Sequence, residues 1–256
     1  SVRTAQTYPD DLVDALNNPP GPTPEPALVQ TGTEPDDPDG WAGYNLLTAF
    51  MMWGGDTFED GVALSESGAA RMAFPREVHI GDKISTRHGF KGVVSRILPD
   101  SEMPSLPDGT VIDAIISPMS LVSRMNYGLL LESVMGLIAH AEGKPAIVPA
   151  YQAPSAADIK DRLKKAGLPE DGMENLSVSG KALPQRSTVG YVYWGRLTHL
   201  AADKVKANDQ RFDETQYGAL KGLSAYATIT DMLGRAKAAG HEVPDIGDLA
   251  DTLATA

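Results

Sequence analysis

Between Trp41 and Pro118 the chain is divided into short apolar runs bounded by glycine, aspartate or proline, and this division constrains the fold most strongly. A short apolar run that ends in turn-forming residues is typical of a β-strand. The pattern therefore predicts strands joined by tight connections, and we expect a compact β unit or barrel. The runs are YNLLTAFMMW, GVALSE, GVVSRIL and VIDAIISP.

The residues that follow have helical spacing. In MNYGLLLESVMGLIAHAEG, apolar residues recur every three or four positions, and Gly143 offers a stop. In SAADIKDRLKKAG we expect a second helix with Ser155 as N-cap, Ile159 and Leu163 on one face, and Gly167 at its end. Later segments predict a strand in TVGYVYWGRL, a helix in THLAADKVKA and a long helical region in DETQYGALKGLSAYATITDMLGRAKAAG.

The first 40 residues are rich in proline, in the stretches NNPPGPTPEP and EPDDPDG. Repeated prolines exclude regular hydrogen-bond ladders, so we expect an arm that wraps around or docks on the remainder. The predicted class is α+β. Its predicted parts are the arm (1–40), the barrel (41–135), a helical and loop insertion (136–189) and a C-terminal helical region (190–256).

Composition excludes several classes of function. The chain has no cysteine, so it has no disulfide framework, thiolate zinc site or cysteine nucleophile. Its formal net charge of -12 argues against nonspecific coating of nucleic acid, which draws on fields of lysine and arginine. It contains no apolar run of about 18 residues and no signal-peptide pattern, so we expect a soluble, cytoplasmic protein with no membrane partner.

One short segment is rich in basic residues, although the chain as a whole is acidic. The stretch HIGDKISTRHGFKGVVSRIL contains Lys83, Arg87, His88, Lys91 and Arg96. Its glycines permit close backbone approach, and its lysines end in flexible ammonium groups, so the segment could hold a polyanion from two sides. Simple solvation of surface lysines is the alternative, because the segment is neither a Walker loop nor a dinucleotide-binding glycine motif.

Several motifs occur in one order across the chain. They are AFMMWGGDTFEDGVALSE, GDK, RHGFKG, SEMP, PDGTVID, and SRMN followed by a helix. In this order they resemble the carboxy-terminal half of the β subunit of cellular multisubunit RNA polymerases. The resemblance extends from about Trp41 to about Leu233 and implies a double-psi β-barrel core with helical C-terminal extensions. It also implies that 190–256 contacts a β′ partner.

The resemblance implies roles for four basic residues. Lys83 and Lys91 match lysines that touch the RNA end and the incoming nucleotide, and Arg124 matches an arginine that meets nucleotide phosphates. His199 matches a histidine near the RNA 5′ end or the initiating nucleotide. Such cations suit phosphoryl transfer, which requires charge neutralisation around the phosphates.

The resemblance also implies how magnesium is held. Glu59 and Asp60 match an acidic pair close to the second Mg²⁺, whereas the family's catalytic motif NADFDGD belongs to β′ and has no counterpart here. We therefore expect a β′-like subunit to hold most of the Mg²⁺ coordination. The other expected partners are nucleoside triphosphates, the RNA transcript and a nucleic-acid template, and the chain alone should not polymerise.

A structural alternative stays open for each residue. Arg124 would brace the following helix, His199 would be a core histidine, and Glu59 with Asp60 would form only a turn. We expect Arg87 and His88 to shape their loop, and Tyr193 and Trp194 to pack rather than to stack on bases. The chain departs from the family by lacking the large flap and by carrying Phe90 and Ser117 where the family has asparagine.

Two main functions remain. The favoured one is a split or minimal β-like subunit of a DNA-directed RNA polymerase, of the kind that a virus or mobile element would carry. The second is a noncatalytic β-like protein that binds or regulates a polymerase subunit. An independent small-molecule enzyme that uses Glu59, Asp60 and His199 is the least favoured hypothesis.

Overall fold

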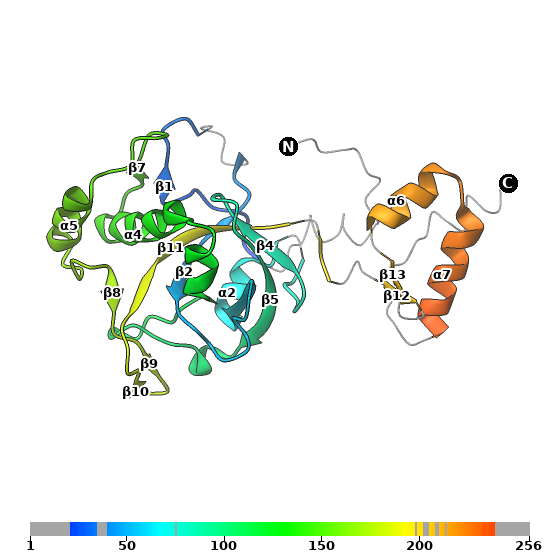
Figure 1. Ribbon diagram of the computed structural model, residues 1–256, viewed down its shortest axis with the longest axis horizontal. Helices are drawn as coiled ribbons and strands as arrows, with labels where there is room; N and C mark the ends of the chain where they lie inside the picture. The colour runs from blue at the N-terminus through cyan, green and yellow to red at the C-terminus, as the bar shows by residue number, and fades with distance from the viewer. Residues whose placement is uncertain are drawn as a thin grey trace. The chain divides into compact units, whose positions relative to one another are not determined.

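The computed structural model describes residues 21–34, 40–74, 76–197, 199–201, 205–207, 210–212 and 214–238 (Figure 1). These residues divide into two compact units. The first unit contains the described residues up to Leu197, and the second contains those from 199 to 238. None of the helices in these ranges is both long and apolar enough to cross a membrane.

Six strands of the first unit close into a mixed β-barrel. Their order is β2, β6, β3, β5, β4, β11, and β11 also pairs with β2 to close the barrel. The pairs β2–β6 and β3–β5 are parallel, and the other pairs are antiparallel. The expected α+β class and double-psi β-barrel are confirmed. The strands are β2 (Tyr44–Phe50), β3 (Gly61–Ser65), β4 (Lys83–Thr86), β5 (Lys91–Leu98), β6 (Ala114–Ile116) and β11 (Ser187–Arg196).

Apolar residues on both faces of several strands explain why the runs read as continuously hydrophobic. Every residue of β2 is buried, because one face lines the barrel interior and the other is covered from outside. One cluster of buried hydrophobic residues fills the barrel interior. Residues that alternate with them along the same strands form a second cluster on the outside of the barrel. Interior residues include Leu46, Val62, Leu64, Ile84, Val94, Ile116, Val192 and Trp194; the outer cluster includes Leu47, Ala49, Ala63, Ile115 and Val189.

Shorter elements connect and cover the barrel (Figure 1). β1 runs parallel to β7, β9 pairs with β10, and β8 extends the sheet at the start of β11. These elements are β1 (Val29–Gln30), α2 (Glu66–Arg71), η2 (Asp100–Glu102), α3 (Pro118–Val122), β7 (Ala146–Ile147), β8 (Met173–Glu174), β9 (Ser177–Val178) and β10 (Lys181–Ala182).

The two helices predicted after the barrel runs are confirmed. α4 (Tyr127–Glu142) ends at Gly143, whose positive φ of 68° is a left-handed cap. α5 (Ala156–Lys165) begins at Ser155, which forms a capping box with Asp158. The strand β11 also confirms the strand predicted in TVGYVYWGRL, and it belongs to the barrel although it lies outside the range 41–135.

α4 lies directly on β11, backbone against backbone. A Cβ at Gly190 would overlap the carbonyl oxygen of Ser133, and a Cβ at Gly136 would overlap that of Tyr191. Each element therefore has a glycine where the other one approaches. Figure 1 shows α4 running across the yellow ribbon of β11. This contact fixes the height of the helix above the barrel.

The second unit contains a two-stranded hairpin and two helices. Its elements are β12 (Val205–Ala207), β13 (Gln210–Phe212), α6 (Glu214–Gly222) and α7 (Tyr226–Ala238). The two helices agree with the long helical region predicted there, with Ile229 as its buried centre. The helix predicted in THLAADKVKA is wrong at 205–207, because pairing with β13 outweighs the weak helical preference of a short segment.

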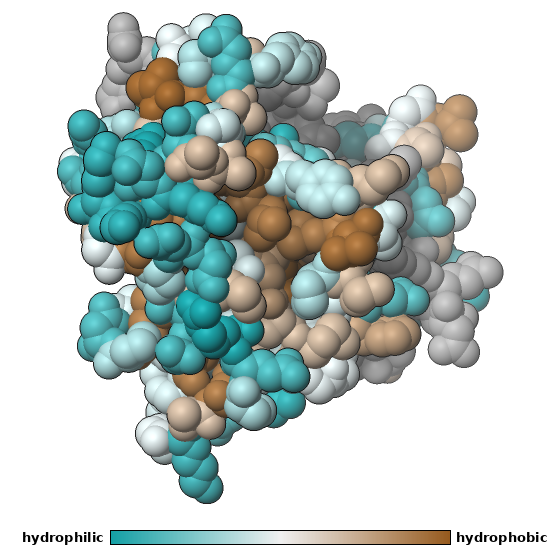
Figure 2. All heavy atoms as spheres, turned by 60° about the vertical axis from the view of Figure 1, so that its left-hand side comes forward, coloured by the Kyte–Doolittle hydropathy of each residue, from teal (hydrophilic) through white to brown (hydrophobic). Residues whose placement is uncertain are grey.

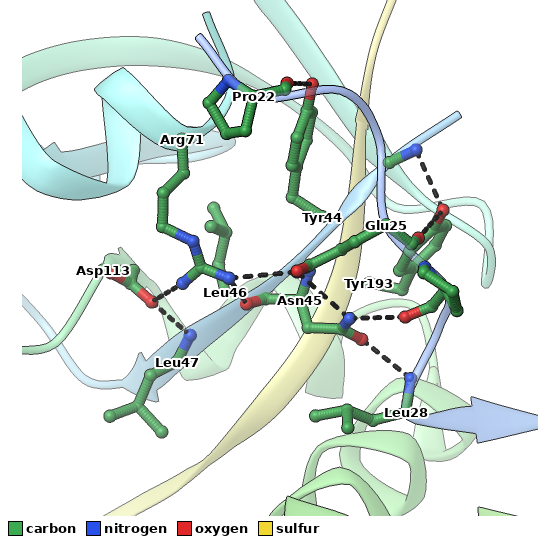
Figure 3. Close-up of polar contacts among 12 residues, drawn as sticks. Pro22, Glu25, Leu28, Tyr44, Asn45, Leu46, Leu47, Arg71, Asp113 and Tyr193 are labelled. Carbon is green, nitrogen blue, oxygen red and sulfur yellow. Dashed lines mark hydrogen bonds and ion pairs between the residues drawn. The ribbon is translucent and has the colours of Figure 1, made fainter. Parts of the chain in front are cut away.

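The described part of the proline-rich arm docks on the barrel, as Figure 3 shows. Tyr44 donates its hydroxyl to the carbonyl oxygen of Pro22 at 2.8 Å, and Tyr193 donates to that of Glu25 at 2.9 Å. The amide of Leu28 donates to Asn45 Oδ1 at 2.9 Å. Backbone groups of the arm thus find partners in barrel side chains, and at Val29–Gln30 they also pair with β7, so the expectation that prolines exclude a ladder fails at these two residues, which are not proline. Residues 1–20 and 35–39 of the predicted arm lie outside the described residues.

Arg71 links the arm to the barrel electrostatically (Figure 3). Its guanidinium lies 3.0 Å from Glu25 Oε1 and 3.1 Å from Asp113 Oδ2, and it donates to the carbonyl oxygen of Asn45 at 2.8 Å. Burial raises the pKa of Asp113, although the amide of Leu47 and the charge of Arg71 act in the opposite direction. Arg71 is therefore the cation that makes the buried carboxylate tolerable.

We expect Gly190→Ala to lower the free energy of unfolding by about 1–3 kcal/mol, because the added methyl group forces α4 away from β11. Urea unfolding of the full chain measures the loss. Gly55→Ala is the matched control, since a Cβ there meets no atom within 4 Å. Equal stability of the two variants would contradict the backbone contact.

We expect Arg71→Met to cost about 1–3 kcal/mol at pH 7, because it leaves Asp113 charged and uncompensated. The pKa of Asp113 is raised in the folded state, so protonation favours folding, and the deficit should shrink as the pH falls toward this pKa. Urea unfolding at pH 7 and pH 4.5 tests this. Arg186→Met removes an exposed ion pair with Asp171 and should cost less than about 1 kcal/mol. A deficit for Arg71→Met that grows in acid would refute the explanation.

Candidate functional site

The hairpin formed by β4 and β5 carries the two lysines singled out in the sequence. Lys83 pairs with Val93, and Ser85 pairs with Lys91. Because directly opposed residues share a face and side chains alternate along each strand, Lys83 and Lys91 rise from the same face of the hairpin. Lys83 and Lys91 are diagonal neighbours across the two strands, a position in which the backbones of two residues are typically about 7–8 Å apart. The opposite face contains Ile84, Gly92 and Val94, which are buried.

Neither lysine contacts a carboxylate among the residues that the structure describes, although most arginines of the barrel unit do. Lys91 is exposed and Lys83 is half-buried. Two like charges on adjacent strands repel each other unless an anion lies between them. The pair is therefore an electrostatic feature that suits a polyanionic ligand.

The turn that contains Glu59 and Asp60 lies against the start of β5. The amide of Val93 donates to the carbonyl oxygen of Asp60 at 3.0 Å. A Cβ at Gly92 would lie 2.7 Å from the same oxygen, so glycine is needed for this approach. Glu59 is exposed and has a φ of 52°, in the left-handed region. Glu59 and Asp60 thus lie in a turn next to the strand of Lys91, and their proximity to a second metal stays a prediction.

Arg124 is tied to this turn. Its Nη2 lies 2.8 Å from Asp60 Oδ2, and its Nη1 donates to the carbonyl oxygen of Ser120 in α3 at 3.2 Å. Ser120 Oγ in turn donates to the carbonyl oxygen of Glu59 at 2.7 Å. The structure therefore brings Arg124, Glu59 and Asp60 to the edge of the barrel that carries Lys91.

These contacts also limit metal binding. The carboxylate of Asp60 is engaged by Arg124, and no group of three or more acidic or histidine residues in the described ranges is arranged to hold a metal ion. Three or more oxygen or nitrogen ligands are the usual protein contribution to a tightly held divalent cation. The residues described do not fit a self-contained metal site.

The tip of the hairpin is held by a residue that the sequence interpretation missed. Glu132 of α4 accepts a hydrogen bond from Arg87 Nη2 at 2.9 Å, and its Oε2 lies 2.5 Å from His88 Nε2. Arg87 also lies over the ring of Tyr193, 5.0 Å from the centroid. The prediction that Arg87 and His88 shape their loop is confirmed. An acidic residue on the otherwise apolar face of α4 was the signal that could have revealed Glu132.

The aromatic residues next to the hairpin pack as predicted. Trp194 is fully buried, donates to Thr48 Oγ1 at 3.1 Å, and meets Phe90 edge-on with ring centroids 5.8 Å apart. Phe90 therefore points into the barrel core. Tyr193 is buried and donates to the arm. These rings are unavailable for base stacking.

His199 belongs to the second unit, where it is exposed. The other five predicted residues lie in the barrel unit. The proposed membership of His199 in the same site therefore stays a prediction.

Exposed apolar side chains flank Arg124 along the chain. Ser117 donates to the sulfur of Met52 at 3.2 Å, and α3 with its flanking loops presents further large hydrophobic residues to solvent. Figure 2 shows that hydrophobic side chains gather on one face of the molecule beside hydrophilic ones. The exposed residues around α3, here called the α3 patch, are Met52, Phe58, Met119, Val122, Met125 and Tyr127.

Comparison with known proteins places these features in a family. The family model described as RNA polymerase Rpb2, domain 6, matches residues 68–211, more than half of the chain. The DNA-directed RNA polymerase subunit beta of Acetivibrio thermocellus is 36% identical over 211 residues, which cover 69% of this chain and 17% of that protein. The subunit beta of Clostridium botulinum is 35% identical over 219 residues, or 77% of this chain and 18% of that protein.

The chain thus spans less than a fifth of the length of these relatives. The match covers the hairpin with Lys83 and Lys91, the loop with Arg124, and the strand that closes the barrel. Fold, motif order and similarity agree, and the chain belongs to the RNA polymerase Rpb2, domain 6, family.

Proposed function

We propose that this chain is a β-like subunit of a DNA-directed RNA polymerase, in which Lys83, Lys91 and Arg124 bind the phosphates of the incoming nucleoside triphosphate and of the RNA end. The observation that carries the proposal is the shared face of Lys83 and Lys91 on the β4–β5 hairpin. The relatives are RNA polymerase subunits beta, which supports the same assignment.

The chemistry follows from the charges. Phosphoryl transfer develops negative charge on the transferred group and the leaving group, and preorganised cations stabilise it without reorganisation. Lys83 and Lys91 would meet the phosphates from one strand pair. Arg124 uses two of its N–H groups on Asp60 and Ser120 and keeps others for a phosphate oxygen. Each contact orients the ligand and neutralises part of its charge.

The catalytic Mg²⁺ is proposed to come with a β′-like partner. The described residues lack a cluster that fits a metal, and Glu59 and Asp60 would at most border it. The α3 patch next to Arg124 supports a protein partner, because exposed apolar groups of this size favour burial in an interface. The RNA transcript and the template would then lie between two chains. The proposed place of His199 is near the RNA 5′ end.

We expect the full chain to bind tripolyphosphate, and Lys83→Ala with Lys91→Ala to weaken binding at least tenfold, since each charge-assisted contact is worth about 1.5–3 kcal/mol. Titration calorimetry at low salt measures the affinity. The control replaces Lys160 and Lys181, two exposed lysines in other elements, by alanine, and so removes the same charge. If both double variants bind tripolyphosphate equally weakly, the loss of affinity follows from net charge alone, and Lys83 and Lys91 do not form a specific site.

We expect primer extension when the chain is mixed with a β′-like subunit that carries an NADFDGD motif, Mg²⁺, a primed template and nucleoside triphosphates. Alanine at Lys83 and Lys91 should reduce the rate of nucleotide addition by about tenfold or more, because charge stabilisation of the transferred group is lost. Radiolabelled transcripts resolved on gels provide the measurement. No extension, or extension that these variants leave unchanged, would reject the polymerase assignment and favour a noncatalytic binding role.

A further inference from the structure

Glu132 is a charged side chain on the buried face of α4. Its side chain is only 4% exposed, and its neighbours Leu129 and Ser133 are fully buried. Transfer of a carboxylate from water to such surroundings is costly unless it is paired and hydrogen-bonded. The contacts that compensate for this burial show what the residue holds in place.

Three groups contact this carboxylate, two from the turn between β4 and β5 and one from β11. Oε1 accepts from Arg87 Nη2 at 2.9 Å and from the backbone amide of Tyr193 at 3.0 Å, and Oε2 lies 2.5 Å from His88 Nε2. Burial alone would raise the pKa of Glu132, but the hydrogen bond from His88 and the charge and hydrogen bond of Arg87 lower it below its usual value. Glu132 is thus an anion that fixes the hairpin turn.

The carboxylate acts where the barrel ladder ends. Pairing of β4 with β11 stops at Thr86 and Trp194. The next amide along β11, that of Tyr193, donates to Glu132. β4 leaves β11 at this point, so the amide of Tyr193 has no partner in β4 and donates to Oε1 of Glu132 instead. The same carboxylate contacts Arg87 and His88 in the turn that follows β4. The direction in which the turn leaves the barrel is set here.

The same turn is held from the side of Arg124. Asn126 Nδ2 donates to the carbonyl oxygen of His88 at 3.2 Å, and a Cβ at Gly128 would lie 2.7 Å from His88 Nδ1. The start of α4 therefore packs on the turn. Lys91 follows His88 by three residues, and Arg124 precedes Asn126 by two. The distance between Lys91 and Arg124 therefore depends on how the start of α4 packs against the turn.

We propose that Glu132 is a positioning residue, which holds the β4–β5 turn against α4 and so sets the spacing of Lys83 and Lys91 relative to Arg124 for a triphosphate. This inference rests on the function proposed above. A ligand that meets preset cations loses less free energy to ordering them, so its affinity depends on the support behind them. Glu132 itself lies behind the turn and acts through it.

The test compares Glu132→Gln with Ile138→Val in the full chain. Glutamine keeps the shape but removes the charge and presents an amide to Arg87 and His88, whereas Ile138 is a fully buried residue of the same helix, away from the turn. We expect Glu132→Gln to speed hydrogen exchange in the peptide 86–92 and to weaken tripolyphosphate binding at least tenfold. Ile138→Val should lower stability without either effect.

Each outcome decides the inference. Wild-type-like binding or exchange in Glu132→Gln, or equal losses in Ile138→Val, would overturn the positioning role. If Glu132→Gln does not fold, His88→Ala removes one of the three contacts, and we expect it to weaken binding about threefold; no change would likewise overturn the role. Failure of the wild type to bind tripolyphosphate would instead reject the proposed function itself, before any variant is compared.

Discussion

The close packing of α4 on β11 is the constraint on which the rest of the structure depends. Gly190 and Gly136 allow the two backbones to meet, so the first turns of α4 lie level with the end of β11 that pairs with β4. From this height Glu132 reaches the amide of Tyr193 and the hairpin turn together. The position of Lys91 therefore depends on a helix that carries none of the cations.

Local signals in the sequence predicted much of this fold. The short apolar runs became β2, β3, β5 and β6, and the spacing in 127–142 became α4, because alternation and helical periodicity are read within one element. Ser155 capped α5 for the same reason. The grouping of Lys83 and Lys91 was also open to prediction, since a tight hairpin fixes which residues share a face.

Nonlocal pairings were beyond such signals. β11 closes the barrel by pairing with β2, as Val192 does with Leu46, across far more chain than any local pattern covers. Arg124 and Asp60 form their ion pair from 64 positions apart. Residues 205–207 became a strand only because a partner strand lies beside them. Motif order could group these residues by family resemblance, but spacing alone could not show which carboxylate each cation meets.

The two carboxylates of the site differ in a way that suits ligand exchange. Asp60 is 38% exposed and its pair with Arg124 is solvated, so the pair is worth about 0–1 kcal/mol and a phosphate can compete for the guanidinium. Glu132 is buried, accepts hydrogen bonds from Arg87 and from the amide of Tyr193, and lies 2.5 Å from His88 Nε2, so removal of its charge takes away the anion that these groups share. In the proposed complex, a phosphate would therefore replace Asp60 as the partner of Arg124, while Glu132 would continue to hold the turn. The same chain thus combines an exchangeable contact with a fixed support, within a molecule whose net charge is strongly negative.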